Sequence, residues 1–166
     1  MARNTERYPV EGPNALWQVY KTVSPLKAVK NFIIIQLARY CPILPWKNWL
    51  YRHGLKMEVG RETAVALMVM MDVFFPERIY IGENTIIGYN TTILTHEYLT
   101  KEYRLGDVRI GSHVMIGANT TILPGVSIGD HAVVAAGSIV HRDVPAYSFV
   151  AGNPAREINR DFKDEE

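Results

Sequence analysis

The chain has 166 residues, with 18 Lys and Arg against 17 Asp and Glu and a formal net charge of +1. This balance excludes the strong overall positive charge of proteins that bind nucleic acid through bulk electrostatics. The length suits one domain, or one domain with a small appendage. The lone Cys41 cannot form an intrachain disulfide, no secretory signal is visible, and no apolar run is long enough to span a bilayer. We therefore expect a cytoplasmic protein.

The first third of the chain is predicted to be helical, after a poorly determined arm at residues 1–12. Residues 13–21 suit a short helix. A longer helix begins at Ser24, the predicted N-cap residue, and ends before Pro42. A third helix is predicted over residues 45–53.

One apolar stripe runs along the longer helix, with spacings of three and four residues typical of a helix face. It consists of Leu26, Val29, Ile33 and Leu37. We interpret residues 1–57 as an arm and a helical cap that packs on the first of a series of repeats, since repeat stacks need caps. The alternative is association with a membrane surface, because cations flank the apolar and Trp residues. These cations are Lys27, Lys30, Arg39, Lys47 and Arg52.

Residues 58–158 are organised by a repeat of six residues. Aliphatic residues recur six apart in two series, which are Ile81, Ile87 and Ile93, and then Ile110, Ile116, Ile122, Ile128, Val134 and Val140. A fainter earlier series, formed by Val59, Val65 and Met71, ends at the sequence DVFFPER. Neither a helix nor simple strand alternation has this period, so it indicates an internal repeat.

A hexad of this kind can supply one short strand and one corner, so three hexads complete a triangular coil. The aliphatic residue then points inward and stacks on its counterparts in neighbouring coils. A small residue four places later fits the inside of the corner, a position held by Thr85, Thr91, Val114, Thr120, Ala132 and Ser138. The sequence therefore predicts a mainly β fold of stacked coils.

The segments IGENTIIGYNTTI, IGSHVMIGANTTILPGVSIGDHAVVAAGSIV and RDVP…VAGNPAREI resemble the hexapeptide-repeat acyltransferases. They are most similar to the O-acetyltransferases of the maltose/galactoside and polysaccharide-modifying type. The resemblance covers residues 58–158 and implies a left-handed parallel β-helix, a homotrimer and acetyl-CoA as the acyl donor. The charged tail at residues 159–166 is expected to fray or to pack loosely on the last coil.

The six-residue rhythm is absent between Ile93 and Ile110, so residues 95–109 must leave the prism as a loop. We interpret this loop as an active-site arm that reaches a neighbouring subunit, rather than as a surface insertion. His96 lies at its root and is the expected catalytic base, because imidazole takes up a proton near neutral pH. It would deprotonate an acceptor hydroxyl that attacks the thioester, and then return the proton to the CoA thiolate. The resemblance places the family's catalytic histidine at this position.

The sequence leaves open which group orients His96. Some relatives have Asp directly before the histidine, where this chain has Thr95. Glu97 would point away from His96 on an extended backbone. Asp72, at the earlier phase break, is the candidate that approaches from one coil below, either to bind substrate or to orient the base. The alternative role for Asp72 is to cap a turn.

The other histidines have simpler interpretations. His113 and His131 hold an outward corner of their hexads and are expected to be solvated turn residues, and His53 is expected to end a helix. The spacing of the histidines includes no close pair. We therefore expect no metal site.

Five residues are candidates for binding acetyl-CoA. By resemblance, the backbone at Ala118 and Ala136 meets the pantetheine arm. His141 and Arg142 match a polar and basic pair at the nucleotide end, and Arg156 matches a residue that contacts phosphate. Guanidinium groups bind phosphate through paired hydrogen bonds, which is consistent with these roles.

These observations predict an acetyl-CoA-dependent O-acetyltransferase that acts on a hydroxyl of a sugar or glycan, with its site between subunits. One alternative is acetyl transfer to an amine or an antibiotic. Another is a non-catalytic trimeric β-helix scaffold, and a further one is an enzyme at the membrane surface that modifies a lipid-linked glycan. Neither nucleic-acid binding nor stable membrane insertion is expected.

Overall fold

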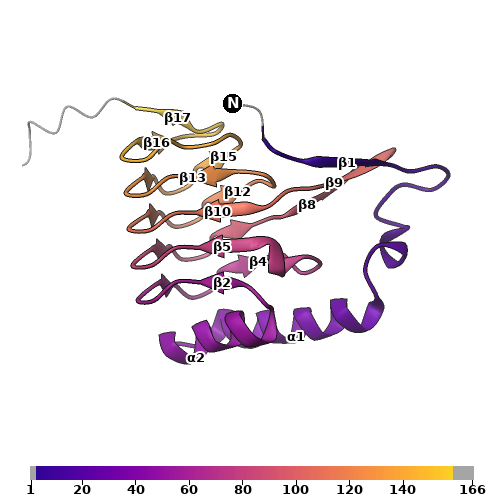
Figure 1. Cartoon of the computed structure of the whole chain (residues 1–166), viewed down its shortest axis with the longest axis horizontal. Coiled ribbons are helices and arrows are strands. Elements are labelled where there is room, and N and C mark those ends of the chain that lie inside the picture. Colours follow the sequence, from indigo (N-terminus) through magenta and orange to yellow (C-terminus); the bar gives the residue numbers. More distant parts are fainter. Residues whose placement is uncertain (1–2, 159–166) are drawn as a thin grey trace, which may run out of the picture.

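The computed structural model describes residues 3–158, which form a three-sided prism of stacked coils with helices across one end (Figure 1). The β2 face consists of β2 (Glu58–Val59), β5 (Ile79–Ile81), β10 (Val108–Ile110) and β13 (Ser127–Ile128). The β3 face consists of β3 (Ala64–Val65), β6 (Ile86–Ile87), β11 (Met115–Ile116), β14 (Val133–Val134) and β16 (Phe149–Ala151), with β17 (Arg156–Glu157) antiparallel at its edge. The β4 face consists of β4 (Met70–Met71), β7 (Thr92–Ile93), β12 (Thr121–Ile122) and β15 (Ile139–Val140).

The chain visits these three faces in turn, and neighbouring coils pair in parallel, so the predicted parallel β-helix is confirmed. The aliphatic residue of every hexad named above is buried, and together they form the continuous core of the prism. The six small residues that follow them are buried as well. Several of the residues just before these small ones have positive φ, which turns the backbone at the corner; they are Asn84, Asn90, His113, Asn119 and His131.

The coils approach one another so closely that one corner requires glycine. A Cβ atom added to Gly117 would lie 2.3 Å from the backbone nitrogen of Ala136 in the next coil. Because backbone atoms of a stacked coil cannot move aside cheaply, any side chain at this position would force the two coils apart.

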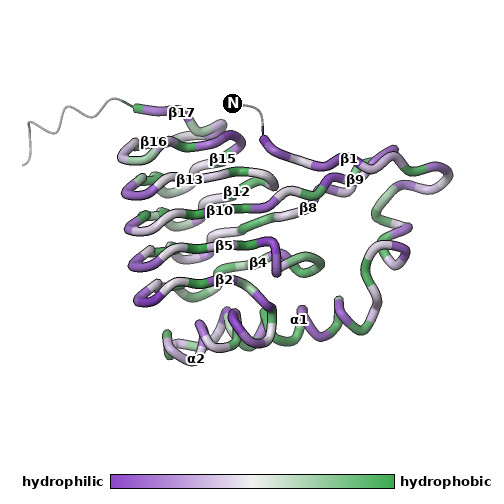
Figure 2. Tube along the Cα trace, in the orientation of Figure 1, coloured by the Kyte–Doolittle hydropathy of each residue, from purple (hydrophilic) through white to green (hydrophobic). Residues whose placement is uncertain are grey.

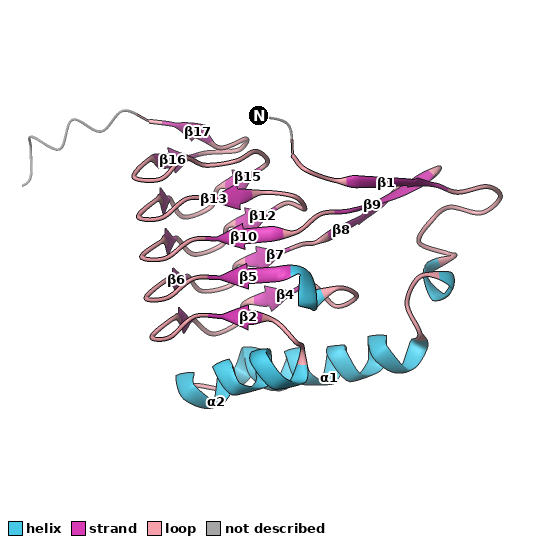
Figure 3. Ribbon diagram, viewed as in Figure 1, coloured by secondary structure: helices cyan, strands magenta, loops and turns pink. Residues whose placement is uncertain are grey.

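Two helices cover the end of the first coil, α1 (Pro25–Tyr40) and α2 (Leu44–Trp49), and Figure 3 shows both lying across it. Ser24 caps α1 as expected, since its hydroxyl accepts a hydrogen bond from the Lys27 backbone. The helix predicted over 45–53 is present, but only its first part is α-helical, and the rest is the π-helical turn η2 (Leu50–Gly54). The helix predicted over 13–21 is wrong except for one 3-10 turn, η1 (Val19–Lys21).

The cap supplies hydrogen-bond donors to the first coil, whose carbonyl groups have no coil beneath them. The buried Lys47 ammonium donates to the carbonyls of Val65 at 3.0 Å and Ala66 at 2.7 Å. Arg52, Asn48 and Asn31 make similar bonds to the carbonyls of Val59, Gly60, Thr63 and Val73. Buried carbonyls need such partners, which explains why the inner side of the cap carries polar residues.

The apolar stripe of α1 does not face the prism. Leu26 is 85% exposed and Leu37 is 60% exposed, and Val29 and Ile33 are exposed with them. The buried side of α1 instead contains Asn31, Ile35 and Ala38. The periodicity correctly identified an apolar side of the helix, but the opposite side packs on the prism. Asn31 on that side donates a hydrogen bond to the Val73 carbonyl, and the small side chain of Ala38 lets the helix approach the first coil closely.

The segment predicted as a loop at 95–109 is a β-hairpin, and the N-terminal arm is a strand that joins it. β8 (His96–Tyr98) pairs with β9 (Glu102–Leu105), and β1 (Glu6–Pro9) pairs with β9 on its other side. Tyr8 stacks on Tyr103 with ring centroids 4.7 Å apart, and Arg7 bonds Glu102 at 2.9 Å. The arm therefore holds the hairpin extended away from the prism (Figure 1).

The tail at residues 159–166 lies outside the described residues. None of the helices within residues 3–158 is long and apolar enough to cross a membrane.

The stacked core makes a direct prediction about stability. We expect Ile122→Ala to lower the free energy of unfolding by about 2–5 kcal/mol, because Ile122 is fully buried and its removal leaves a cavity. Urea denaturation followed by circular dichroism measures this loss. The control is Thr121→Ala, in the outward-facing neighbour of the same strand, which should change stability by less than about 1 kcal/mol. Equal losses in both variants would contradict the inward assignment of the hexad residue.

Candidate active site

Both breaks in the six-residue rhythm leave the prism at the same corner. The first comprises residues 72–78, between β4 and β5, and includes the short turn η3 (Pro76–Arg78). The second comprises residues 94–107, between β7 and β10, and contains the hairpin. Each connects the β4 face to the β2 face, so we call this the β4–β2 corner. Because Met71 pairs with Ile93, Asp72 lies one coil below the root of the hairpin, as predicted.

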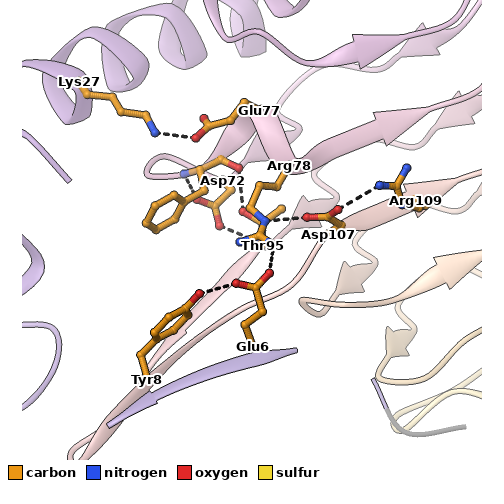
Figure 4. Close-up of polar contacts among 10 residues, drawn as sticks. Glu6, Tyr8, Lys27, Asp72, Glu77, Arg78, Thr95, Asp107 and Arg109 are labelled. Carbon is orange, nitrogen blue, oxygen red and sulfur yellow. Dashed lines mark hydrogen bonds and ion pairs between the residues drawn. The ribbon is translucent and has the colours of Figure 1, made fainter. Parts of the chain in front are cut away.

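Asp72 and His96 are hydrogen-bonded at this corner, with 2.5 Å between the Asp72 Oδ2 and His96 Nδ1 atoms. The Asp72 side chain is completely buried and that of His96 is 17% exposed. Asp72 Oδ2 also accepts from the Thr95 backbone at 2.7 Å (Figure 4), and Oδ1 accepts from the backbone of Phe74 and Phe75. Asp72 thus caps the turn of the first break and contacts the histidine at the second.

The carboxylate of Asp72 is held in its ionised form. Burial by itself raises its pKa, but hydrogen bonds from His96 and from the backbone of Phe75 and Thr95 outweigh burial and hold the pKa below the ordinary value of 3.8. An ionised carboxylate can only accept, so His96 Nδ1 carries the shared hydrogen. In the neutral imidazole, the other ring nitrogen, Nε2, then has a free lone pair.

Three aromatic rings surround the His96 imidazole. The ring centroids of Phe74, Tyr98 and Phe75 lie 5.0, 5.1 and 6.2 Å from it. The Tyr98 hydroxyl lies 2.7 Å from the Thr22 hydroxyl, which belongs to the segment before α1. Burial raises the pKa of Tyr98, so this phenol remains neutral and can donate a hydrogen bond. The corner therefore combines one titratable nitrogen with largely apolar walls.

An ion-pair network fixes the root of the hairpin. Arg78, from the first break, lies between Glu6 of β1 and Asp107 at the end of the second break, with 2.6 Å to each carboxylate (Figure 4). Asp107 also bonds Arg109 at 3.0 Å. The sequence does not reveal this network, because its members are far apart in the chain and carry no repeat spacing.

Glu97 turns away from His96, as expected from strand alternation, and bonds Arg3 at 2.7 Å. His113 and His131 are exposed corner residues with positive φ, and their rings stack 4.8 Å apart. Their prediction as turn residues is confirmed. Among residues 3–158, no three His, Cys, Asp or Glu side chains are grouped so as to hold a metal ion.

Three of the residues predicted to bind acetyl-CoA lie together at the last coil. His141, Arg142 and Arg156 line a cavity of about 220 Å³. His141 Nε2 accepts a hydrogen bond from Arg142 at 3.1 Å and lies 3.3 Å from an Arg156 nitrogen. Burial and the two guanidinium groups lower the pKa of His141, so the imidazole stays neutral beside them. Arg142 and Arg156 give the cavity two guanidinium groups that can bind an anionic group, and the acidic residues Asp143 and Glu157 line it as well.

Ala118 and Ala136 lie elsewhere, at the corner between the β3 and β4 faces. They occupy equivalent turns of adjacent coils, and Gly137 donates its backbone N–H to the Ala118 carbonyl at 2.8 Å. His96 and His141 follow strands of the β4 face at its other edge. A single chain therefore does not bring Ala118 and Ala136 to the corner that holds His96.

The chain resembles known proteins in sequence and in fold. A family model described as the hexapeptide repeat of succinyl-transferase matches residues 107–142. A Bacillus subtilis protein named "Putative acetyltransferase YvoF" is 66% identical over 156 residues, which cover 94% of this chain and 91% of that protein.

Solved structures of acetyltransferases share the fold. The hexapeptide-repeat acetyltransferase VCA0836 of Vibrio cholerae, in complex with acetyl-CoA, is 25% identical with a TM-score of 0.68, over 81% of this chain and 86% of that one. A galactoside acetyltransferase in complex with coenzyme A is 25% identical with a TM-score of 0.67, over 86% and 88% of the two chains.

The pKa of Asp72 makes a prediction about pH. Its carboxylate has a lowered pKa in the folded protein, so its stabilising effect is complete above the ordinary value of 3.8 and is lost as the pH falls below it. Asp72→Asn should therefore be less stable than the unmodified protein at neutral pH, and the difference should shrink as the pH falls through 3.8. Urea midpoints measured for both proteins at a series of pH values test this. A difference that does not change with pH would show that the charge of Asp72 has no stabilising role.

Proposed function

We propose that this chain, which belongs to the hexapeptide-repeat acetyltransferases, transfers an acetyl group from acetyl-CoA to a hydroxyl of a sugar or glycan. Family membership rests on the identity of 66% to the Bacillus subtilis relative over nearly the whole chain. The fold agrees, since the structural neighbours are left-handed β-helix acetyltransferases, as the sequence predicted. The chain is an acetyltransferase like these relatives, so the scaffold alternative is set aside.

The observation that carries the proposed mechanism is the bond between Asp72 and His96. Acetyl transfer from a thioester to a hydroxyl requires that the hydroxyl lose its proton as it attacks the carbonyl carbon. A histidine whose Nδ1 is bound to a buried carboxylate presents a basic Nε2, held in one orientation. General bases of this kind contribute about 10²–10⁴-fold to a rate.

In the proposed reaction, His96 Nε2 takes the proton of the acceptor hydroxyl while the hydroxyl oxygen forms a bond to the acetyl carbon. The carbon–sulfur bond then breaks, and the protonated His96 returns the proton to the departing thiolate. The products are an acetyl ester and free CoA thiol. The Asp72 carboxylate stabilises the imidazolium that forms between the two proton transfers, and it remains ionised throughout.

Asp72 acts in this scheme as a positioning residue. It was also a candidate for binding substrate directly, but its side chain is fully buried and both oxygens accept hydrogen bonds from the protein. An acceptor would have no surface of Asp72 to contact. The turn-capping bonds to Phe74 and Phe75 fix the carboxylate so that it holds the histidine in one orientation.

The surroundings of His96 support a ring-shaped acceptor that carries hydroxyl groups. Phe74, Phe75 and Tyr98 offer apolar surfaces against which the nonpolar faces of such a ring can pack. The Tyr98 and Thr22 hydroxyls add polar contacts beside the imidazole. The galactoside acetyltransferase among the structural neighbours supports a sugar as the acceptor class.

The basic cluster at the last coil supports acetyl-CoA as the donor. Arg142 and Arg156 can bind the phosphate groups of the nucleotide end, and His141 can contribute a further polar contact. The acetyl-CoA bound by the Vibrio cholerae neighbour is consistent with this role. Bound there, the donor would supply the activated thioester, and the arginines would hold its anionic end.

A homotrimer would bring the separated site residues together. The outward residues of the β3 face are apolar, namely Ala64, Ile86, Met115 and Val133. The equivalent residues of the β2 face are charged or polar, namely Glu58, Tyr80, Arg109 and Ser127. The apolar β3 face favours contact with a second copy. A neighbouring subunit could then present its Ala118 and Ala136 to the pantetheine arm beside His96.

The test of the proposed function is an acceptor screen that reports free CoA thiol. The panel contains sugars, nucleotide sugars, amines and antibiotics, and we expect turnover with a sugar or glycan hydroxyl. His96→Ala should lower kcat by about 10²–10⁴-fold at unchanged fold.

The matched control for this screen is His113→Asn, because asparagine holds the equivalent corner at Asn84 and tolerates positive φ. It should retain full activity. Turnover with amines alone, or a His96→Ala enzyme as active as the unmodified protein, would contradict the proposal.

A second kinetic prediction concerns the donor site. Arg142→Gln and Arg156→Gln should each raise KM for acetyl-CoA roughly tenfold or more and leave kcat nearly unchanged, because each removes a charged hydrogen bond to a part of the donor that does not react. The control is Arg61→Gln, whose guanidinium is 90% exposed on the first coil. Unchanged KM values in both site variants would place the nucleotide end elsewhere.

A further inference from the structure

The outer side of the helical cap is an exposed apolar surface, which we call the outer cap face. Its main residues are Leu26, Phe32, Leu37 and Tyr40 of α1 with Trp46 and Trp49 of α2, and all six are exposed. Trp side chains are highly buried on average, but Trp46 and Trp49 are 66% and 59% exposed. Figure 2 shows hydrophobic segments along both helices, at the end of the molecule farthest from the last coil.

This face is hollowed and continuous. A cavity of about 590 Å³ opens on it between the two helices, lined by Leu37, Cys41, Trp46, Trp49 and Leu50. The helix α1 is apolar on both of its sides, since Ile35 and Ala38 pack on the prism while the stripe of Leu26 and Leu37 faces outward. Exposed apolar patches of this kind commonly mark contact surfaces, so we expect a partner to cover the outer cap face.

The charge of the cap identifies the chemistry of that partner. From Gly12 to Met57 the sequence contains no Asp or Glu, and it contains seven cations, which are Lys21, Lys27, Lys30, Arg39, Lys47, Arg52 and Lys56. The rest of the chain holds all 17 acidic residues against eleven Lys and Arg. Among the described residues of the cap, only Lys27 forms an ion pair with a carboxylate, that of Glu77. The chain is nearly neutral as a whole, but the cap carries a net positive charge, of which Lys47 and Arg52 donate inward to the first coil.

We propose that the outer cap face docks on the surface of an anionic phospholipid bilayer. The helices α1 and α2 lie flat in the headgroup region, with the aromatic and aliphatic side chains at the boundary of the acyl chains. Lys30 and Lys56 are exposed and meet the lipid phosphates, and the Lys30 ammonium also donates to the Gly54 carbonyl at 3.1 Å. The association is peripheral, because no helix within residues 3–158 could cross the membrane.

A second copy of the chain is the less favourable partner for this face. An isologous contact would bring two cationic caps together without any carboxylate between them, and like charges in an interface oppose binding. The apolar β3 face, by comparison, carries no such charge in its outward residues Ile86 and Met115. The charge difference therefore assigns the β3 face to protein contact and the outer cap face to lipid.

Co-sedimentation of the full chain with vesicles tests this proposal. We expect binding to vesicles made of equal parts phosphatidylcholine and phosphatidylglycerol, and little binding to phosphatidylcholine alone. All three Trp residues of the chain, Trp17, Trp46 and Trp49, belong to the cap, so their fluorescence should shift to the blue on binding. Vesicles that contain brominated acyl chains should quench this fluorescence.

Two double variants and one control distinguish a loss of lipid binding from a loss of folding. The double variant Lys30→Gln with Lys56→Gln should weaken partitioning roughly thirtyfold, from about 1 kcal/mol per cation at an anionic surface. The matched control, Lys101→Gln with Arg109→Gln, removes two exposed cations at the hairpin and the β2 face and should bind like the unmodified protein. Trp46→Ala with Trp49→Ala should abolish binding and leave the circular dichroism spectrum unchanged.

Two results would overturn the proposal. The first is that the full chain fails to sediment with the anionic vesicles. The second is that sedimentation velocity without lipid shows larger assemblies that Trp46→Ala with Trp49→Ala disperses, because the cap would then bind a second copy.

Discussion

Each coil of the prism can bury its aliphatic residues and satisfy its backbone only against the coil next to it. The close approach at Gly117 leaves no room for a side chain between coils, so an insertion cannot stay inside the stack. Extra residues have to leave at a corner, and an end of the stack has to be covered. The cap, the hairpin and the candidate site are consequences of this one constraint.

The two insertions leave at the same corner, one coil apart, and this arrangement creates the candidate site. The first insertion must close its own turn, for which Asp72 accepts backbone hydrogen bonds from Phe74 and Phe75. The same carboxylate then faces the root of the second insertion and binds His96. The carboxylate that closes the turn thus also orients the proposed base. The ion pairs of Arg78 with Glu6 and Asp107 hold the two insertions in fixed positions relative to each other.

The sequence predicted the features that depend on the repeat, and it failed where contacts are not periodic. Hexad spacing alone identified the core from Val59 to Val140 and the corner where His96 lies. The pairing of β1 with β9 was missed, although the alternating charges and aromatics of ERYP and EYRL are a signal that could have revealed it. The orientation of α1 was also missed, because both of its sides are apolar and the buried donor Asn31 decides which one packs inward. The sequence offered Asp72 as a candidate for the group that orients His96, but it could not establish the hydrogen bond between them. Contacts between coils depend on how the coils align in space, which no repeat spacing gives.

The most direct test of the account is the protonation state of the His96 ring. Two-dimensional nitrogen–proton NMR of the full chain, with His96 assigned by comparison with His96→Gln, reports which ring nitrogen carries the hydrogen. The Asp72–His96 hydrogen bond predicts that the neutral His96 ring carries its hydrogen on Nδ1, with Nε2 free, and that Asp72→Asn removes this preference. A ring protonated on Nε2 in the unmodified protein would contradict it, because the nitrogen that must take the acceptor proton would already be occupied.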